Sequence, residues 1–244
     1  MDFQPDIFLE ALTSRALQQG VQVTIALTVV AMIAGLALGL LVALMRDHSS
    51  PILRGVAWTY VWLFRGIPTL VLLLIVWYAL PQLFPPLKER WFNQFLAASI
   101  ALSVNEAAYA AEIIRGGLLS VDEGQRLAAR ALGLSPTKVF TKVIAPQVVR
   151  VTIPPLSNDF ITMLKITSLA AFISLQELLS LTRTAISLNF RFAEYYAAAA
   201  IYYLVLVSIF MVGQAWIERR FRWTSQRAGG RSAADLVRQL APLR

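Results

Sequence analysis

The sequence contains no cysteine and a single histidine, His48. These absences exclude disulfides, thiolate catalysis and metal sites built from cysteine or from several histidines. Charged residues are also scarce, at 15 % of the 244 residues against about 25 % in an average soluble domain. With 57 % hydrophobic residues, the chain is too apolar to be disordered and has too few charges to cover the surface of a soluble enzyme.

Long apolar runs indicate membrane-spanning helices, each of which needs about 20 residues. Three runs, 16–45, 66–87 and 195–217, contain no charged residue, although prolines from Pro81 onward should end the second helix near Leu80. Two further runs, 91–114 and 151–181, contain a few charged residues, which we expect to face protein because a charge facing lipid is costly. The sequence therefore predicts an all-α membrane protein with one transmembrane domain over residues 1–244. Its five spans are expected at about 20–45, 56–80, 92–115, 153–180 and 194–217.

The basic residues predict the orientation of these spans. Five spans place the two termini on opposite sides, and sixteen of the 22 Lys and Arg residues then lie on the side of the C-terminus, five on the other side and Lys165 within a span. Because basic residues favour the cytoplasmic side, we expect the N-terminus outside, and the loop 116–152 and the tail 218–244 in the cytoplasm. The net charge of +8 is then an orientation signal rather than a nucleic-acid surface.

The loop 116–152 has the outline of two short helices joined by a turn. Asp122 and Glu123 precede a run of helix-forming residues, Gly133 has the place of a C-terminal glycine, and Ser135 with Pro136 begins a second helix. This pattern is compatible with an amphipathic connector, a DNA-binding helix-turn-helix, or a docking surface for a cytoplasmic partner. The tether between two spans and the short length disfavour DNA binding.

This loop and several words around it resemble the permease subunits of ABC transporters, in particular those of polar amino acid uptake. In that family the EAA loop reads Glu-Ala-Ala, three residues, Gly, nine residues, Ile-x-Leu-Pro, and the matching positions here are Leu127, Ala128, Ala129, Gly133, Val143, Ala145 and Pro146. Further similar words are FRGIP (64–68), RGGLLSVDEGQ (115–125), ALGLS (131–135), APQVVR (145–150), IPPLSNDFI (153–161) and LKITSLA (164–170). The resemblance covers about residues 20–220. It departs at Leu127, which replaces the glutamate, at Ala145, which replaces a leucine, and at Ile166, where a polar residue is common.

The resemblance implies a type I ABC importer permease fold, in the inner membrane of a bacterium, that imports a polar amino acid. It implies an ABC ATPase dimer, a second permease (identical or homologous) and a periplasmic or other extracytoplasmic binding protein as partners, besides the lipid bilayer, and no nucleic acid. The chain has no Gly-x-x-x-x-Gly-Lys-Ser/Thr phosphate loop, so we expect no catalytic residue and no cofactor in it, and ATP with Mg²⁺ on the ATPase. The residues expected to couple to the ATPase, on a coupling helix and around it, are Gly124, Leu127, Ala128, Ala129, Gly133 and Pro146.

Ionisable residues within spans are candidates for the substrate path. At about 1.5 Å of rise per residue, Glu106 and Lys165 lie near the middle of the membrane, where an acid and a lysine suit the ammonium and carboxylate of an amino acid. The further candidates are Asn105, Tyr109, Pro68, Asn158 and Asp159. The alternative is that Glu106 and Lys165 pair with each other or with backbone, which we favour for Lys165.

Two functions of other classes remain compatible with the residues. An ion-coupled secondary amino acid transporter would use the intramembrane acids as proton or sodium sites and would need no docking loop. A membrane-bound regulator would place the loop on DNA. The family resemblance favours the importer over both.

Overall fold

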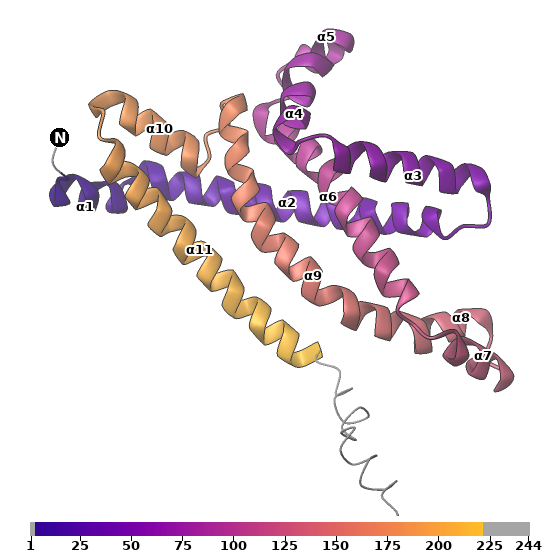
Figure 1. Ribbon diagram of the computed structural model, residues 1–244. Helices are drawn as coiled ribbons and strands as arrows, with labels where there is room; N and C mark the ends of the chain where they lie inside the picture. Colours follow the sequence, from indigo (N-terminus) through magenta and orange to yellow (C-terminus); the bar gives the residue numbers. More distant parts are fainter. Residues whose placement is uncertain (1–2, 222–244) are drawn as a thin grey trace, which may run out of the picture.

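The computed structural model describes residues 3–221, and every regular element in that range is a helix (Figure 1). The α-helices are α1 (Pro5–Thr13), α2 (Arg15–Arg46), α3 (Pro51–Gly66), α4 (Thr69–Leu74), α5 (Leu80–Leu83), α6 (Gln94–Leu119), α7 (Glu123–Ala131), α8 (Pro136–Val139), α9 (Ala145–Ile166), α10 (Leu178–Asn189) and α11 (Phe192–Phe221). Two π-helices, η1 (Ile75–Ala79) and η3 (Phe140–Ile144), and two 3₁₀-helices, η2 (Pro85–Lys88) and η4 (Thr167–Ile173), join them. The all-α prediction is confirmed.

By length and composition, three helical segments of the described chain suffice to cross a membrane: Arg15–Arg46, Pro136–Ile173 and Phe192–Arg219. They coincide with the first, fourth and fifth expected spans. Helix α6, at the place of the third, has 26 residues and is long enough, but it falls short of the others in apolar composition. Its polar residues face the interior, since Asn105 and Glu106 are buried.

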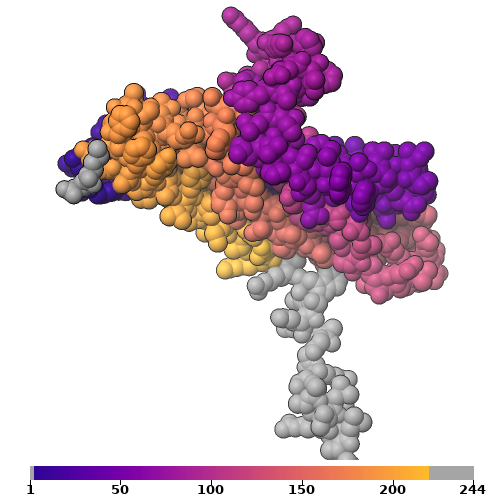
Figure 2. Space-filling model, turned by 45° about the horizontal axis from the view of Figure 1, so that its top comes forward, coloured from indigo at the N-terminus to yellow at the C-terminus, as the bar shows by residue number. Residues whose placement is uncertain are grey.

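The second expected span differs most from the structure. Instead of one helix over 56–80, α3 and the segment Thr69–Leu83 meet at an angle of 102° and make at most one broken span. The bend follows from Pro68, which disfavours a helical conformation at the residue before it, and Ile67 is accordingly extended. Beyond the bend, α4 packs on the body of the molecule, and α5 stands out from it (Figures 1 and 2).

Other boundaries also shift. The helix expected at 153–180 begins earlier, at Ala145, contains Pro154 and Pro155 in its interior, and ends at Ile173, where Ser174 has a positive φ of 62°. The loop expected at 116–152 is shorter, because α6 continues to Leu119. Of the tail expected from residue 218, the structure describes only the end of α11, and residues 222–244 lie outside the described part.

The long helices α2 and α6 pack closely because glycines of α2 face α6. A Cβ on Gly35 would lie 2.7 Å from Cβ and Cγ of Glu106, and a Cβ on Gly39 would lie 2.7 Å from Cβ of Ala110. Two glycines four residues apart let helix backbones approach each other, as membrane helices commonly do. The backbone of α2 therefore packs against Cβ and Cγ of Glu106.

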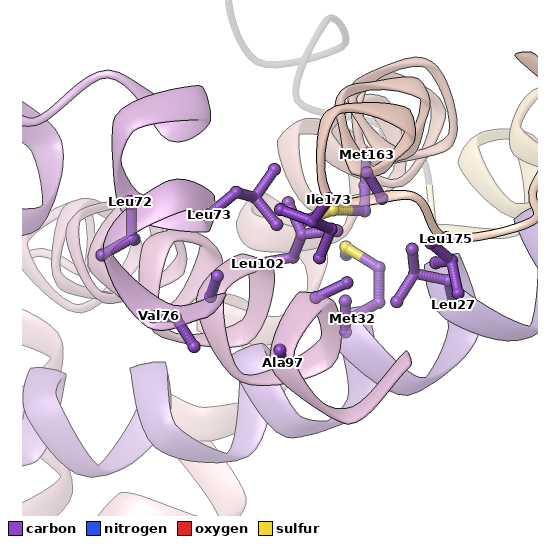
Figure 3. Packing of buried hydrophobic residues seen from close by; sticks show 14 of the residues in the cluster. Leu27, Met32, Leu72, Leu73, Val76, Ala97, Leu102, Met163, Ile173 and Leu175 are labelled. Carbon is purple, nitrogen blue, oxygen red and sulfur yellow. The ribbon is translucent and has the colours of Figure 1, made fainter. Parts of the chain in front are cut away.

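A hydrophobic cluster joins α2, α4, α6, α9 and η4 (Figure 3). Among its buried members are Leu27, Met32, Leu72, Leu73, Leu102, Met163 and Ile173. This cluster fixes α4 on α6 and α9 despite the bend that precedes it. The two ends of the helical bundle carry different elements, with α1 and α10 at one end and α7 and α8 at the other (Figure 1).

Candidate functional site

A cavity of about 200 Å³ lies where α4, α6 and α9 meet. Its polar lining consists of Thr69, Asn105, Glu106, Tyr109, Asp159 and Thr162, and its apolar lining of Met163 and Ile166. The cavity therefore brings together Asn105, Glu106, Tyr109 and Asp159 of the residues that the sequence places on the substrate path. Its volume is below the roughly 300 Å³ at which sites for drug-sized ligands begin, which suits a small solute.

Glu106 is the most enclosed acid of the cavity. Its side chain belongs to a residue that is 5 % exposed, and its Oε1 atom is buried without a hydrogen-bond partner. A buried carboxylate oxygen without a partner is costly, so its presence requires an explanation. The ion pairs Arg46–Glu112, Arg115–Glu112 and Arg191–Glu194 of the described residues do not include Glu106.

Asn105 ties the cavity to the bend between α3 and α4. Its Nδ2 donates a hydrogen bond to the carbonyl of Phe64 at 2.7 Å, and its Oδ1 accepts one from Thr69 Oγ1 at 3.2 Å. Four residues after Phe64 stands Pro68, which has no N–H to donate to that carbonyl. The Asn105 amide thus satisfies a carbonyl that the proline leaves open, and it holds the start of α4 at the cavity.

The remaining path candidates lie outside the cavity lining. Pro68 is exposed beside the lining residue Thr69, and Asn158 and Lys165 are exposed on α9. Lys165 makes no ion pair with Glu106, so the alternative in which these two residues pair with each other is not found in the structure. Glu112 pairs with Arg115 at 3.1 Å, as its spacing predicts, and also with Arg46 at 2.9 Å.

Three residues near the cavity escaped the sequence analysis. Thr69 and Thr162 are lining residues without an ionisable group. The guanidinium carbon of Arg65 lies 5.2 Å from the centre of the Tyr109 ring, a cation–π contact on a cavity residue. Arg65 lies within the family-like word FRGIP (64–68), and Thr69 follows it directly. The word marks this segment in the sequence but does not indicate that it lies near α6.

The helix–turn–helix outline of the loop is confirmed. Asp122 is the N-cap of α7, and its Oδ1 accepts a hydrogen bond from the Gly124 amide at 2.8 Å. Gly133 follows the helix with a φ of +76°, a left-handed conformation that favours glycine. Its amide donates to the Arg130 carbonyl, and the next amide, of Leu134, donates to the Ala129 carbonyl.

Helix α7 packs against the ends of α6 and α9 and is hydrogen-bonded to both helices. Ala129 is buried in a cluster with residues of both flanking elements: Leu118, Val121, Val139, Ile144 and Val148. Arg126 Nη2 donates to the Leu118 carbonyl at 3.0 Å, and Gln147 Nε2 donates to Gln125 Oε1 at 2.6 Å. The loop therefore forms a compact unit with the two long helices.

The opposite side of this unit is exposed. Leu127 is 59 % and Leu132 83 % exposed, and the expected coupling residues Gly124, Ala128, Gly133 and Pro146 are exposed as well. Ala129 differs from the expectation for these residues, because it contacts the chain's own core and is 5 % exposed. Leu127 and Leu132 therefore leave apolar surface of the loop unit open to contact with another protein.

Residues 35–223 match the family described as binding-protein-dependent transport system inner membrane component. The chain belongs to this family. The match covers the cavity, the loop unit and most of the long helices. The resemblance to ABC permeases is thereby confirmed.

Curated relatives include amino acid permeases. The chain is 41 % identical to the arginine transport system permease protein ArgU of Corynebacterium glutamicum over 214 residues, which are 84 % of this chain and 67 % of that protein. It is 34 % identical to the glutamine transport system permease protein GlnP of Escherichia coli K12, over 84 % of this chain and 92 % of that protein.

Solved structures with the same fold are also available. A chain of the crystal structure of an amino acid ABC transporter with histidines aligns with a TM-score of 0.81 and 33 % identity, over 90 % of this chain and all of that chain. A chain of the MetNI methionine ABC transporter aligns with a TM-score of 0.68 at 21 % identity, which supports the fold alone. The type I importer permease fold is confirmed.

Proposed function

We propose that this chain is a permease subunit of an ATP-driven importer of a polar amino acid. We further propose that the substrate binds in the cavity between α4, α6 and α9 on its way across the membrane. The observation that carries the proposal is that two of the three helices lining the cavity, α6 and α9, also hold the loop unit of α7 and α8, which we call the docking unit. Family membership and the named relatives support the class of transporter. Because those relatives serve different amino acids, their names leave the substrate of this chain open.

The geometry provides a mechanical link between the docking unit and the cavity. On α6, thirteen residues separate Glu106 from Leu119, and on α9, fourteen separate Ala145 from Asp159, so each helix spans about 20 Å between the two places. Near the loop, Gly117 permits α6 and α9 to touch at Thr152 and Val148. A displacement of α7 therefore moves both cavity walls as rigid bodies, which is how alternating access is generally achieved.

The other subunits follow from this arrangement. The exposed face around Leu127 and Leu132 docks on an ATPase, where ATP and Mg²⁺ bind and are used. A second permease, identical or homologous, completes the path, since α5 stands out from one subunit with Leu83 and Phe84 exposed. An extracytoplasmic binding protein delivers the substrate on the side of the N-terminus, and the docking unit lies in the cytoplasm of a bacterium, as the distribution of basic residues predicts.

An ion-coupled secondary transporter has no observation in its favour. Such a protein needs no docking unit, whereas here Asp122, Gly133 and the buried Ala129 build one with an exposed apolar face. A DNA-binding role is disfavoured for the same reason, because the exposed side of α7 presents Leu127 at its centre.

Uptake of a labelled amino acid into proteoliposomes tests the proposal. The permease, its ATPase and its binding protein are reconstituted, and uptake is expected only with ATP. Glu106→Gln is expected to lower the rate at least about tenfold, as loss of one buried charged contact does. Lys165→Gln is the control, because Lys165 is exposed outside the cavity. Uptake driven by an ion gradient without ATP, or equal rates for Glu106→Gln and wild type, would refute the proposal.

A further inference from the structure

The charges around the cavity carry information about the substrate. Two carboxylates, Glu106 and Asp159, belong to the lining, and none of the described lining residues is basic. Glu106 is more than nine-tenths buried, and its Oε1 has no partner from the protein. Two acids in one small cavity repel each other and lose hydration, so a positive partner there stabilises their charged forms.

The neighbouring basic residues of the membrane region do not supply that partner. Arg46 and Arg115 are engaged by Glu112, and Lys165 is exposed outside the lining. Arg65 lies over the ring of Tyr109 beside the cavity, outside its lining, and it forms no ion pair with Glu106 or Asp159. The positive charge that Glu106 and Asp159 lack is therefore left to a ligand.

On the basis of the proposed function, we propose that the cavity selects amino acids with a cationic side chain, such as arginine and lysine. These substrates carry two cationic groups and one carboxylate, the reverse of the two acids and the one adjacent guanidinium found here. Glu106 and Asp159 bind the α-ammonium and the side-chain cation, and Arg65 binds the α-carboxylate at the edge of the cavity beside Tyr109.

Other amino acids match this charge pattern less well. A neutral polar amino acid such as glutamine supplies one cation and leaves a carboxylate of the cavity without a partner. An acidic amino acid adds a further negative charge beside Glu106 and Asp159. A binding site rejects a substrate that leaves a buried charge unpaired more strongly than one with a misplaced methylene group. The selectivity for cationic amino acids therefore comes from the poor fit of other amino acids as well as from contacts with the cationic ones.

Equilibrium binding to the purified complex tests this selectivity. The full permease chain with its ATPase is placed in nanodiscs without the binding protein, so that only the site in the permease is measured. Radiolabelled L-arginine is the probe, and lysine, glutamine and glutamate compete. Lysine is expected to displace arginine at a comparable concentration, and glutamine only at a concentration at least about tenfold higher.

Single substitutions test whether the side chains of Glu106 and Arg65 cause this selectivity. Glu106→Gln is expected to weaken arginine binding at least about tenfold and to reduce the difference between the affinities for arginine and glutamine. Arg65→Gln is expected to weaken all amino acids by a similar factor, because the α-carboxylate is common to them. Glu112→Gln is the matched control, since it removes a carboxylate of the same helix that lies outside the lining. Its preference for arginine over glutamine is expected to stay that of wild type.

Each failure has a separate meaning. If glutamine competes as well as lysine, or if a complex that imports amino acids with ATP binds no arginine, the cationic selectivity is wrong and the proposed function stands. If no amino acid is taken up with ATP while arginine binds with the expected preference, the proposed function is wrong and the selectivity of the cavity stands. Loss of the arginine preference in Glu112→Gln would overturn the assignment to Glu106.

Discussion

Two neighbouring glycines at the end of α6 offer a test of how the docking unit is joined to the long helices. Gly116 and Gly117 are consecutive, but only Gly117 faces α9. A Cβ on Gly117 would lie 2.5 Å from Thr152 Cγ2 and 3.2 Å from Val148 Cγ1, whereas a Cβ on Gly116 would meet nothing within 4 Å. We therefore expect Gly117→Ala to be destabilising relative to Gly116→Ala.

The size of the difference follows from the contact. Carbon atoms prefer separations of about 3.5–4.0 Å, so Thr152 or the whole of α9 must move by about 1 Å in Gly117→Ala. Such overpacking costs about 1–3 kcal/mol in the free energy of unfolding. The gain in helix propensity from glycine to alanine, about 1 kcal/mol, is common to both variants and cancels in the comparison. A difference of about 2 kcal/mol corresponds to about 4–8 °C in melting temperature for a chain of this length.

Thermal unfolding of the purified transporter measures this difference. Adding Thr152→Ser to Gly117→Ala removes the methyl group in the way while keeping the hydroxyl that donates to the Val149 carbonyl, so it is expected to recover at least half of the loss. Two single variants that melt within about 1 °C of each other, or a double variant that melts no higher than Gly117→Ala, would refute the close approach of α6 and α9 at this point.

Three further predictions concern the docking unit. Asp122→Ala removes the acceptor of the Gly124 amide, which costs α7 about 1 kcal/mol, so hydrogen exchange over residues 123–131 should be about fivefold faster; unchanged exchange would contradict the cap. Gly133→Ala places a Cβ at a φ of +76° and should lower the melting temperature by about 2–8 °C, since the left-handed conformation costs about 1–2 kcal/mol; a higher melting temperature would argue against this turn. Leu127→Arg should leave the melting temperature within about 1 °C because the side chain is exposed, but should reduce the ATPase that co-purifies; undiminished co-purification would exclude this face as the docking site.

Features with a local cause were predictable from the sequence. The N-cap at Asp122, the left-handed Gly133 and the start of α8 at Pro136 depend on residues within a few positions of each other, and the structure has all three. The helical class followed from the long apolar runs alone. The grouping of Asn105 and Tyr109 also has a local cause, because i and i+4 lie on the same face of a helix.

Features that depend on tertiary contacts were not predictable in this way. Pro68 marks a bend, but the 102° angle is held by Asn105, which is 37 residues further along and completes the hydrogen bonding of Phe64. Ala128 and Ala129 look alike in the sequence, yet only Ala129 is buried, because the turn at Gly133 folds α8 back over that side of α7. Lys165 lies on the same helix as Asp159, six residues away, and the direction of its side chain depends on the packing of α9 against α6.

The absence of cysteine permits a direct test of the claim that ATP hydrolysis on the partner acts on a substrate-filled cavity of this chain. Thr162→Cys places one thiol in the cavity lining, and Thr141→Cys places one on exposed η3 as a control. In the complete transporter with cysteine-free partners, the rate of labelling by a maleimide reagent is measured. The account predicts that the transported amino acid slows labelling of Thr162→Cys several-fold and that trapping the ATPase with ATP and vanadate changes the rate again, with no substrate effect on Thr141→Cys. A rate at Thr162→Cys that is the same in all three conditions would contradict it.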